Sequence, residues 1–407
     1  ELRDDIMPQD WGERGAASGI SEEQIRRCAE VYIRSNATII CYGMGLTQHQ
    51  LGSRLLQQVA ALLLLKGNYG KPGAGISPIR GHSNVQGDRT VGIDERPSAA
   101  YLDRVAEIFG FDPPREHGHH TIESVEAMES GTARVFIGLG GNFVRAIPDT
   151  ARAFDAMRKL DLTVGIATKL NRGHLVHGKD ALILPVIARS ERIETAAGEQ
   201  FVTIEDSMSN VTASHGVLDP ASEHLLPEVE IVCRMAMAAL PDSKVDWASY
   251  IDDYARIRDR IADVYPAVYA DFGERIKAPK GFHLDIAPRR RAWLTPNGKA
   301  NFLPLPGLHV DAPVDDPGML RLATVRSHDQ FNTTIYSYND RYRGVYNDRM
   351  VVFMNAEDMA ARGLAEGAKI TLETISTDGI VRRGGGLTAI GYPLPAGARA
   401  GHFPQLN

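Results

Sequence analysis

Residues 133–142 read ARVFIGLGGN, a short apolar run that ends in a glycine turn, which is the pattern of a β-strand followed by a tight turn. The same order recurs at residues 37–43, ATIICYG, where β-branched residues predict a buried parallel strand. A helix is expected after each turn, at 147–160, opened by Pro148, and at 50–66. This alternation of strands and helices predicts an α/β fold with a doubly wound parallel sheet.

Further segments extend the pattern on both sides. A helix is expected at 21–34, where Ser21 and Gln24 have the spacing of a capping box, and two more strands are expected at 162–168 and 180–185. Residues 59–65, VAALLLL, are far shorter than the roughly 20 residues of a bilayer span, so they predict a core helix and no transmembrane segment.

The sequence predicts three consecutive domains. Residues 1–216 form the Rossmann-like α/β domain, 217–317 form a helical connector, and 318–407 form a small β-rich domain. A linker with two prolines at 310–318 separates the last two. The connector is expected to hold helices near 223–240 and 246–270, and the β-rich domain strands at 320–327, 349–355 and 369–376 and a helix at 356–364.

Both glycine turns are expected at one edge of the sheet, because open α/β sheets bind ligands at the carboxyl ends of their strands. The turn GMGLTQHQLG, residues 43–52, offers backbone N–H groups and a helix N-terminus to a phosphate. Gln48 stands where a dinucleotide fingerprint has its third glycine, which weakens a nicotinamide dehydrogenase as the function. The alternative is that each glycine only serves a tight turn.

Residues 77–97, SPIRGHSNVQGDRTVGIDERP, carry many different hydrogen-bonding side chains and show neither a helical nor a strand period. This predicts a polar loop next to the ligand edge. Because substitutions in exposed loops usually change stability by no more than about 0.5 kcal/mol, replacing Asn84 and Gln86 is expected to leave folding nearly unchanged.

The composition is that of an ordinary globular protein, with 43% hydrophobic and 24% charged residues. The net charge of −6 argues against a protein that coats nucleic acid. Cys28, Cys41 and Cys233 have no metal-ligand spacing, and their odd, low number favours a reducing, cytoplasmic compartment and three buried thiols.

Histidine clusters give only a weak signal for a metal. HGHH at 117–120 lacks nearby cysteines and helical spacing, so a solvated loop is the preferred interpretation. His174 and His177 are better explained by a loop near the ligand edge. No nucleophile elbow or carboxylate pair stands out, so the catalytic residues stay unknown and no metal ligand is assigned.

Four stretches closely resemble the molybdopterin oxidoreductases, the dimethyl sulfoxide reductase-like superfamily, and within it the formate dehydrogenase-like alpha subunits. They are CYGMGLTQHQLG at 41–52, KGNYGKPGAGISPIRGHSNVQGDRTVGI at 66–93, FIGLGGNFVRAIPDT at 136–150 and RLATVRSHDQFNTTIYSYNDRYRG at 321–344. The resemblance covers nearly the whole chain and corresponds to the C-terminal half of such a subunit.

The resemblance implies a molybdenum centre held by two molybdopterin guanine dinucleotides and two binding domains for them, the last a truncated, double-psi-barrel-like cap. A pterin edge carries many donors and acceptors, which explains the mixed polar loop. The residues it implies as cofactor-binding lie in four groups. They are Gly43, Met44, Gly45 and Gln48; Arg80, His82, Ser83, Asn84, Val85, Gln86, Gly87 and Asp88; Gly140, Gly141, Asn142, Phe143, Thr168, Lys169, Asn171 and Asp180; and Thr324, Arg326, His328, Thr333 and Thr334.

Within this set, the resemblance implies that the two glycine turns hold phosphate and ribose. It implies that the guanosine end is held by Thr168, Lys169 and Asn171, and that Asp180 binds guanine. Arg326 and His328 stand two apart and are expected to share one side of the cap strand. The alternative for Arg326 is that it forms an exposed salt bridge and does not bind the cofactor.

The iron–sulfur cysteines and metal ligand of the family precede the region that this chain matches. The resemblance therefore implies that a [4Fe-4S] cluster occurs only in a full-length protein and that the chain alone is inactive. The expected function is two-electron transfer at the metal, with a small-molecule substrate and an electron-transfer partner subunit. The alternative is a cofactor-binding or maturation module without redox activity.

Overall fold

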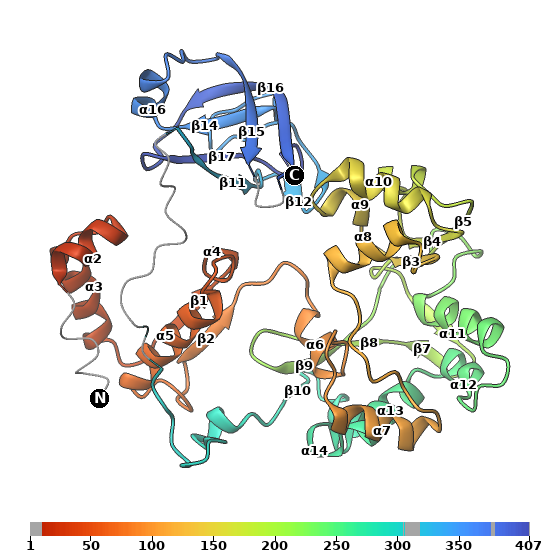
Figure 1. Ribbon diagram of the computed structural model, residues 1–407. Coiled ribbons are helices and arrows are strands. Elements are labelled where there is room, and N and C mark those ends of the chain that lie inside the picture. The colour runs from red at the N-terminus through yellow and green to blue at the C-terminus, as the bar shows by residue number, and fades with distance from the viewer. Residues whose placement is uncertain (1–9, 304, 306–317, 376–378, 407) are drawn as a thin grey trace. The chain divides into compact units, whose positions relative to one another are not determined.

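The computed structural model describes residues 10–303, 305, 318–375 and 379–406 (Figure 1). The chain divides into two compact units, each built from two separate stretches. Unit 1 comprises Glu1–Gly118 and Ile187–Pro313, and unit 2 comprises His119–Val186 and Val314–Asn407. The domain boundaries at 216 and 317 stay a prediction, and the linker expected at 310–318 lies, apart from Gly318, outside the described residues.

Unit 1 begins with α2 (Trp11–Ser18) and α3 (Glu22–Arg34). The predicted capping box of α3 is confirmed, since the Ser21 side chain accepts from the Gln24 backbone and Gln24 bonds back. Strand β1 (Ile39–Tyr42) is parallel to β2 (Gly75–Pro78), and between them lie α4 (Met44–Thr47) and α5 (Gly52–Leu65). β1 is not buried as expected, because its residues alternate between exposed and half-buried.

The rest of unit 1 packs helices around a β-hairpin. Its elements are α6 (Val85–Thr90), α7 (Ala99–Phe109), β6 (Ile193–Thr195), β7 (Gly198–Gln200), β8 (Val202–Glu205), β9 (Asn210–Ser214), α11 (Glu228–Ala239), α12 (Trp247–Asp252), α13 (Ala255–Val264), α14 (Pro266–Tyr269), α15 (Phe272–Arg275), β10 (Phe282–His283) and the 3₁₀ helix η2 (Ala287–Arg290). Val211, Tyr269 and Phe272 are central to one core that joins β9 to α14 and α15.

Unit 2 contains the parallel sheet predicted from the glycine-turn pattern. Strands β3 (Val135–Leu139), β4 (Leu162–Ala167) and β5 (Asp180–Pro185) lie side by side in that order (Figure 1). The helices of this part are α8 (Thr121–Ser130), α9 (Phe143–Ala146), α10 (Thr150–Arg158) and the 3₁₀ helix η1 (Arg172–Leu175). Met128, Ala156 and Leu160 are buried in the core that α8 and α10 form with it.

Two details of the parallel fold differ from expectation. The described strands form two separate parallel sheets, β1–β2 and β3–β4–β5, so the two glycine turns do not lie at one sheet edge. The helix expected at 147–160 is confirmed as α10 but begins only at Thr150, because Ile147 before Pro148 is extended and Asp149 has a φ of 57°. A residue that precedes proline is driven out of the helical region, which separates α9 from α10.

The C-terminal part of unit 2 is β-rich, as predicted. It contains β11 (Arg321–Val325), β12 (Gln330–Phe331), β13 (Thr334–Ile335), β14 (Val351–Met354), α16 (Ala356–Ala361), β15 (Lys369–Ile375), β16 (Val381–Gly391) and β17 (Ala398–His402). The sheet order is β11-β17-β14-β16-β15, with parallel and antiparallel pairs. Val352, Phe353, Leu387 and Ala389 are fully buried and form its centre.

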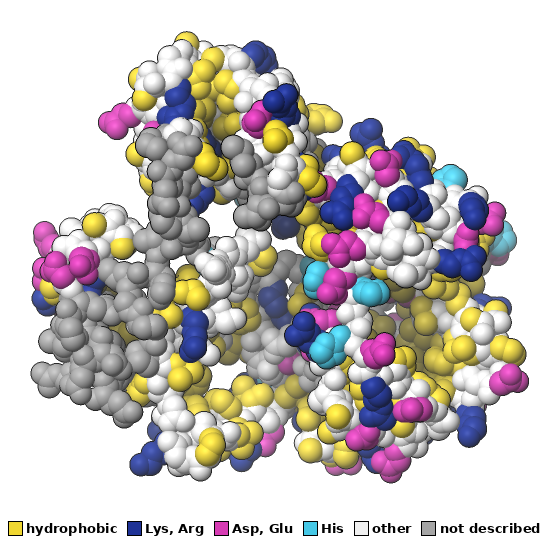
Figure 2. Space-filling model, viewed as in Figure 1, with side chains coloured by type: hydrophobic (Ala, Val, Ile, Leu, Met, Phe, Trp, Pro, Cys, Tyr) yellow, Lys and Arg dark blue, Asp and Glu magenta, His cyan; other side chains and the backbone are white. Residues whose placement is uncertain are grey.

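The surface and the cysteines give three further observations. Figure 2 shows positive and negative side chains interspersed on one face of the described residues, in keeping with the modest net charge of −6. No described helix has the length and apolar composition needed to cross a bilayer. Only Cys233 is buried, and the expectation for Cys28 and Cys41 is wrong because α3 and β1 turn these residues outward.

A close backbone approach at Gly281 gives a test of the unit 1 fold. Gly281 has a φ of +66°, and a Cβ there would collide with the carbonyl oxygen of Val211, where β10 meets β9. Gly298 has nearly the same φ, +65°, but open space around a Cβ. We expect Gly281→Ala to cost about 1–3 kcal/mol more than Gly298→Ala, because only the former adds a clash to the same backbone strain.

Urea unfolding of both variants measures this difference. Equal losses of stability would show that β10 does not pack against β9 as described.

Candidate functional site

A glycine-rich segment lines a wide groove of unit 1. The groove has a volume of about 740 Å³, and residues 68–76, Pro78, Gln86 and residues 207–209 contribute to its wall. Most of the stretch that carries the family resemblance at 67–78 therefore faces one concavity. Gly70, Gly73 and Gly75 are part of this wall.

The polar segment after β2 is not the open loop that the sequence predicted. Residues 85–90 form helix α6, and the side chains of Asn84 and Gln86 bond to the β8–β9 hairpin. Gln86 Nε2 donates to Glu205 Oε1 at 2.6 Å and to Ser209 Oγ at 2.9 Å, while Asn84 Oδ1 accepts from the Glu205 backbone N–H at 2.9 Å. Sequence periodicity misses these bonds because their partners lie about 120 residues further along the chain.

Other residues of this segment remain accessible. His82, Ser83, Val85 and Asp88 are exposed, and Arg189 donates to Ser83 Oγ at 2.9 Å. Arg80 Nη2 donates to the Glu205 backbone carbonyl at 3.0 Å, but its Nη1 is buried without a partner among the described residues. A buried guanidinium nitrogen without an acceptor is costly, so this atom fits a site that receives an acceptor from a ligand.

The second cluster lies in unit 2, at the carboxyl ends of β3 and β4. Gly140, Gly141, Asn142, Phe143 and Asn171 line one small cavity of about 70 Å³ together with His174 and His177. Asn171 Nδ2 donates to the carbonyl oxygen of Gly141 at 2.8 Å, which ties the two turns together. The φ angles of Gly140 and Gly141, 69° and 73°, explain why two successive glycines stand there.

The structure brings this turn into contact with the motif at 321–344, which is called the cap segment below. Asn142 Nδ2 donates to Thr333 Oγ1 at 3.4 Å, and Asn142 Oδ1 is buried without a partner among the described residues. In addition, Arg382 of β16 forms an ion pair with Asp149. Two residues that the resemblance implied as cofactor-binding, 191 positions apart, are therefore in contact.

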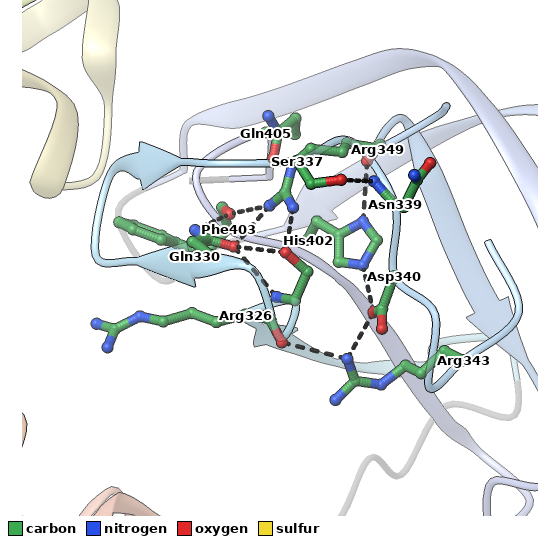
Figure 3. A network of polar contacts seen from close by, with 11 residues as sticks. Arg326, Gln330, Ser337, Asn339, Asp340, Arg343, Arg349, His402, Phe403 and Gln405 are labelled. Atoms are coloured by element: carbon green, nitrogen blue, oxygen red, sulfur yellow. Dashed lines mark hydrogen bonds and ion pairs between the residues drawn. The ribbon is translucent and has the colours of Figure 1, made fainter. Parts of the chain in front are cut away.

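The cap segment rests on a buried polar network (Figure 3). Arg349, only 3% exposed, donates to Ser327 Oγ at 2.5 Å, to Gln330 Oε1 at 2.7 Å and to the Phe403 carbonyl at 2.8 Å. Gln330 Nε2 also donates to the Asn332 and Phe403 carbonyls, both at 2.7 Å. Residues 327–332 are thereby fixed to the end of β17.

A second part of the network lies around Asp340. His402 Nε2 is 3.0 Å from Asp340 Oδ2, and Arg343 Nη1 is 2.6 Å from the same oxygen. Burial by itself raises the pKa of Asp340, but the hydrogen bonds from His402 and Arg343 outweigh burial and hold this pKa below its ordinary value of 3.8. Burial also lowers the pKa of Arg349 below its ordinary value.

Alternation continues past β11, as the sequence predicted for Arg326 and His328. Both are exposed and Ser327 between them is buried. The Arg326 side chain points away from the network in Figure 3 and lies over the Phe403 ring, 5.7 Å from its centroid. Within the described residues it makes no ion pair, so the salt-bridge alternative finds no support there.

Several implied residues lie apart from these clusters. Gly43 and Gln48 flank the four-residue helix α4, which contains Met44 and Gly45. The helix expected at 50–66 is confirmed as α5. Asp180 is the first residue of β5 and pairs with Leu162, at the opposite end of the sheet from Asn171. Thr168 and Lys169 are exposed in the β4–η1 loop, and Thr324 and Thr334 are exposed in β11 and β13.

The histidines have structural partners. His120 caps α8, accepting from the backbone of Ile122 and Glu123, and His174 Nδ1 accepts from the Asn171 backbone. Across the described ranges, no three His, Cys, Asp or Glu side chains come together as metal ligands would.

Sequence analysis missed the residues that support the site: Glu205, Asp340, Arg349 and His402. The sequence gives little indication of them, since a buried charged residue cannot be told from a surface residue until its partners are known. The hairpins at 193–214 had a clearer signal, the alternating pattern around Gly198.

Comparisons with known proteins define the class. Residues 320–378 match the "Molydopterin dinucleotide binding domain" model. Protein YdeP of Shigella flexneri is 48% identical over 409 residues, covering 100% of this chain and 54% of that protein. An uncharacterized oxidoreductase of Mycobacterium bovis, Mb2924c, is 45% identical over 397 residues, covering 96% of this chain and 50% of that protein.

Two more distant similarities were also found. YrhE of Bacillus subtilis strain 168, named as a candidate formate dehydrogenase, is 30% identical over 167 residues, covering 38% of this chain and 16% of that protein. The structure of acetylene hydratase from Pelobacter acetylenicus aligns with a TM-score of 0.58 at 14% identity, covering 98% of this chain and 58% of that chain, which shows likeness of fold alone.

The matched domain and the relatives define a dinucleotide-binding oxidoreductase class. The chain belongs to the molybdopterin oxidoreductase family, as the sequence motifs predicted. It spans about half the length of the curated relatives YdeP and Mb2924c.

The polar contacts of Gln86 give a test that differs from the sequence expectation. Gln86→Leu leaves the Glu205 carboxylate, 3% exposed overall, and Ser209 without this donor. We expect a loss of about 1–3 kcal/mol in urea unfolding, because a buried acceptor loses its hydrogen bond. Val85→Ala in the same helix, at a position 44% exposed, is the control and should change stability by no more than about 0.5 kcal/mol. Equal effects would contradict the packing of α6 on the hairpin.

Asp340 gives a pH-dependent test. We expect Asp340→Asn to reduce stability at pH 7 by about 2–4 kcal/mol, because buried His402 and half-buried Arg343 lose their buried carboxylate partner. Since the folded pKa of Asp340 lies below 3.8, its contribution is present above that pH and is lost as pH falls through the folded value. Denaturant unfolding from pH 7 to 3 should show the two proteins converging at the acid end. A constant difference would contradict the assigned ion pair.

Proposed function

We propose that this chain binds bis(molybdopterin guanine dinucleotide) in a molybdenum or tungsten oxidoreductase of the formate dehydrogenase-like branch. The observation that carries the proposal is the contact between Asn142 and Thr333, which joins the glycine turn to the segment matched by the dinucleotide-binding domain. Both residues belong to motifs that resemble the family's cofactor-binding segments. The likeness to a candidate formate dehydrogenase supports the branch.

Each group of residues would bind a different part of the cofactor. The groove beside residues 67–78, with Arg80, His82, Ser83 and Asp88 near it in sequence, would receive one pterin and its phosphates. Gly140, Gly141 and Asn142 would receive phosphate and ribose through backbone N–H groups and the unpaired Asn142 Oδ1. Asn171, Thr168 and Lys169 would hold the guanosine end, since their loop reaches the same turn.

The β-rich part would act as a cap, with a double-psi-barrel-like topology. Arg326 would bind a pyrophosphate oxygen, because its guanidinium is exposed and points away from the buried network. Thr333 and Thr334 would add hydroxyl donors. When bound, the metal centre supplies two-electron redox chemistry, and the chain's residues contribute binding, orientation and exclusion of water.

The wider activity belongs to a longer protein in this proposal. A [4Fe-4S] cluster and a metal ligand would come from the part of the relatives that this chain does not match, with electrons passing to a partner subunit in the cytoplasm. A small molecule such as formate would be the substrate. The chain alone would not turn over formate.

Metal and pterin analysis tests the proposal. After expression in a host that makes the guanine dinucleotide cofactor, we expect the protein to contain molybdenum or tungsten, pterin and acid-released GMP. Asn142→Ala should lower all three together, since it removes the side chain that joins turn and cap. Asn301→Ala, at an exposed position of unit 1, is the control and should match wild type.

Wild-type protein free of metal, pterin and GMP would refute the proposal. Cofactor without iron or turnover, in a protein as long as the relatives, would favour a cofactor-binding module instead of an oxidoreductase.

A further inference from the structure

We propose that Tyr342, backed by His328, is a stacking platform for a planar 2-amino-4-oxopyrimidine ring, the ring system that guanine and pterin share. This inference rests on the proposed function, which it deepens by assigning one subsite of the cap. Four independent features of the described residues support it.

The first feature is the distribution of exposed tyrosines. Of the 13 tyrosines in the chain, all of which are described, the four exposed ones are Tyr336, Tyr338, Tyr342 and Tyr346, at 73%, 65%, 70% and 62%. They fall within 11 consecutive residues. Large aromatic rings left in water are unfavourable unless they contact a partner, so this concentration marks a recognition surface.

The second feature is that one of these rings is held in place. The ring centroids of His328 and Tyr342 lie 4.4 Å apart at an interplanar angle of 55°. Because Tyr342 is nevertheless 70% exposed, much of its surface is still open to a ligand. An aromatic side chain that is already oriented loses less conformational entropy when a ring stacks on it.

The third feature is the rigid base beneath the platform. The backbones of Asp340 and Val345 bond to each other in both directions, at 2.7 and 3.1 Å, so Tyr342 lies within a closed turn. Arg343, the next residue, donates to buried Asp340 and to the Arg326 carbonyl, at 2.6 and 3.2 Å (Figure 3). The turn and the segment that carries His328 are therefore fixed to one another.

The fourth feature is the positive charge on the two segments that carry His328 and Tyr342. Arg326 is exposed, and Arg341 pairs with Asp329 at 3.3 Å. A guanidinium near an aromatic ring suits a ligand that combines a flat base with phosphate. The match to a dinucleotide-binding domain at 320–378 includes all of these residues, which favours a nucleotide over a protein partner.

Titration calorimetry on the whole chain, produced in a host that does not make the guanine dinucleotide cofactor, tests the platform with two probes, GDP and pterin-6-carboxylate. We expect wild type to bind at least one of them. Tyr342→Leu should weaken that binding by about 5- to 100-fold, the effect of losing one base–aromatic stack. Tyr342→Phe keeps the ring and should remain within about twofold of wild type, by the same reasoning.

Tyr346→Leu is the matched control, because Tyr346 is exposed in the same segment and lies outside the ring pair. Thermal unfolding of each variant should match wild type, which separates lost stacking from lost folding. Binding of GDP alone assigns the platform to guanine, and binding of the pterin alone assigns it to pterin.

Two outcomes would overturn the platform: wild type that binds neither probe at millimolar concentration, or Tyr342→Leu that binds as wild type does. Metal and pterin content of protein from a host that makes the cofactor separates this from the proposed function. Protein that contains the cofactor but binds rings independently of Tyr342 refutes only the platform. Protein without cofactor that binds GDP through Tyr342 refutes only the proposed function.

Discussion

The β-rich part of the chain depends on the hydrogen bonds that hold the guanidinium of Arg349. This guanidinium is buried, and the four acceptors that hold it, from Ser327, Gln330, Phe403 and Gln405, are all uncharged. A buried cation is stable only when its N–H groups are satisfied, so these acceptors must keep their positions. The segment at 327–332 and the residues after β17 are thereby fixed together, although they are more than 70 positions apart.

Unit 1 has a comparable arrangement around a buried carboxylate instead of a buried guanidinium. Glu205 is buried at the end of β8 and is held by Gln86, while its backbone groups bond to Asn84 and Arg80. In both units a single buried ionisable residue fixes a polar segment that resembles a cofactor motif. The side chains that remain exposed, His82 and Ser83 in one unit and Arg326 and His328 in the other, are presented from a fixed backbone. Such preorganisation reduces the entropy that a ligand has to overcome.

Local patterns predicted much of the fold. The capping box of α3, the strands β3 to β5 and the alternation at 326–328 follow from spacing over a few residues, which the sequence displays directly. The separation of β1–β2 from β3–β5 does not, because strand pairing depends on contacts that no local period encodes. For the same reason Asn84 and Gln86 were expected to be exposed, whereas their partners on β8 and β9 make them part of the packing. The family resemblance supplied the candidate site, and the structure brought Gly140–Asn142, Asn171 and Thr333 together.

Each compact unit is assembled from two stretches of chain, so the polypeptide passes between the units after residues 118, 186 and 313. During synthesis, the stretch up to residue 118 must wait for residues beyond 187 before the β8–β9 hairpin can accept Asn84 and Gln86. The parallel sheet of unit 2 is made in the interval, but Thr333, which contacts Asn142, emerges only after the second stretch of unit 1. Contacts between such distant residues slow folding, because a long loop must close before they can form. While residues 119–313 are being made, a nascent chain therefore exposes two incomplete units, because unit 1 needs its second stretch from Ile187 and unit 2 needs its second stretch from Val314.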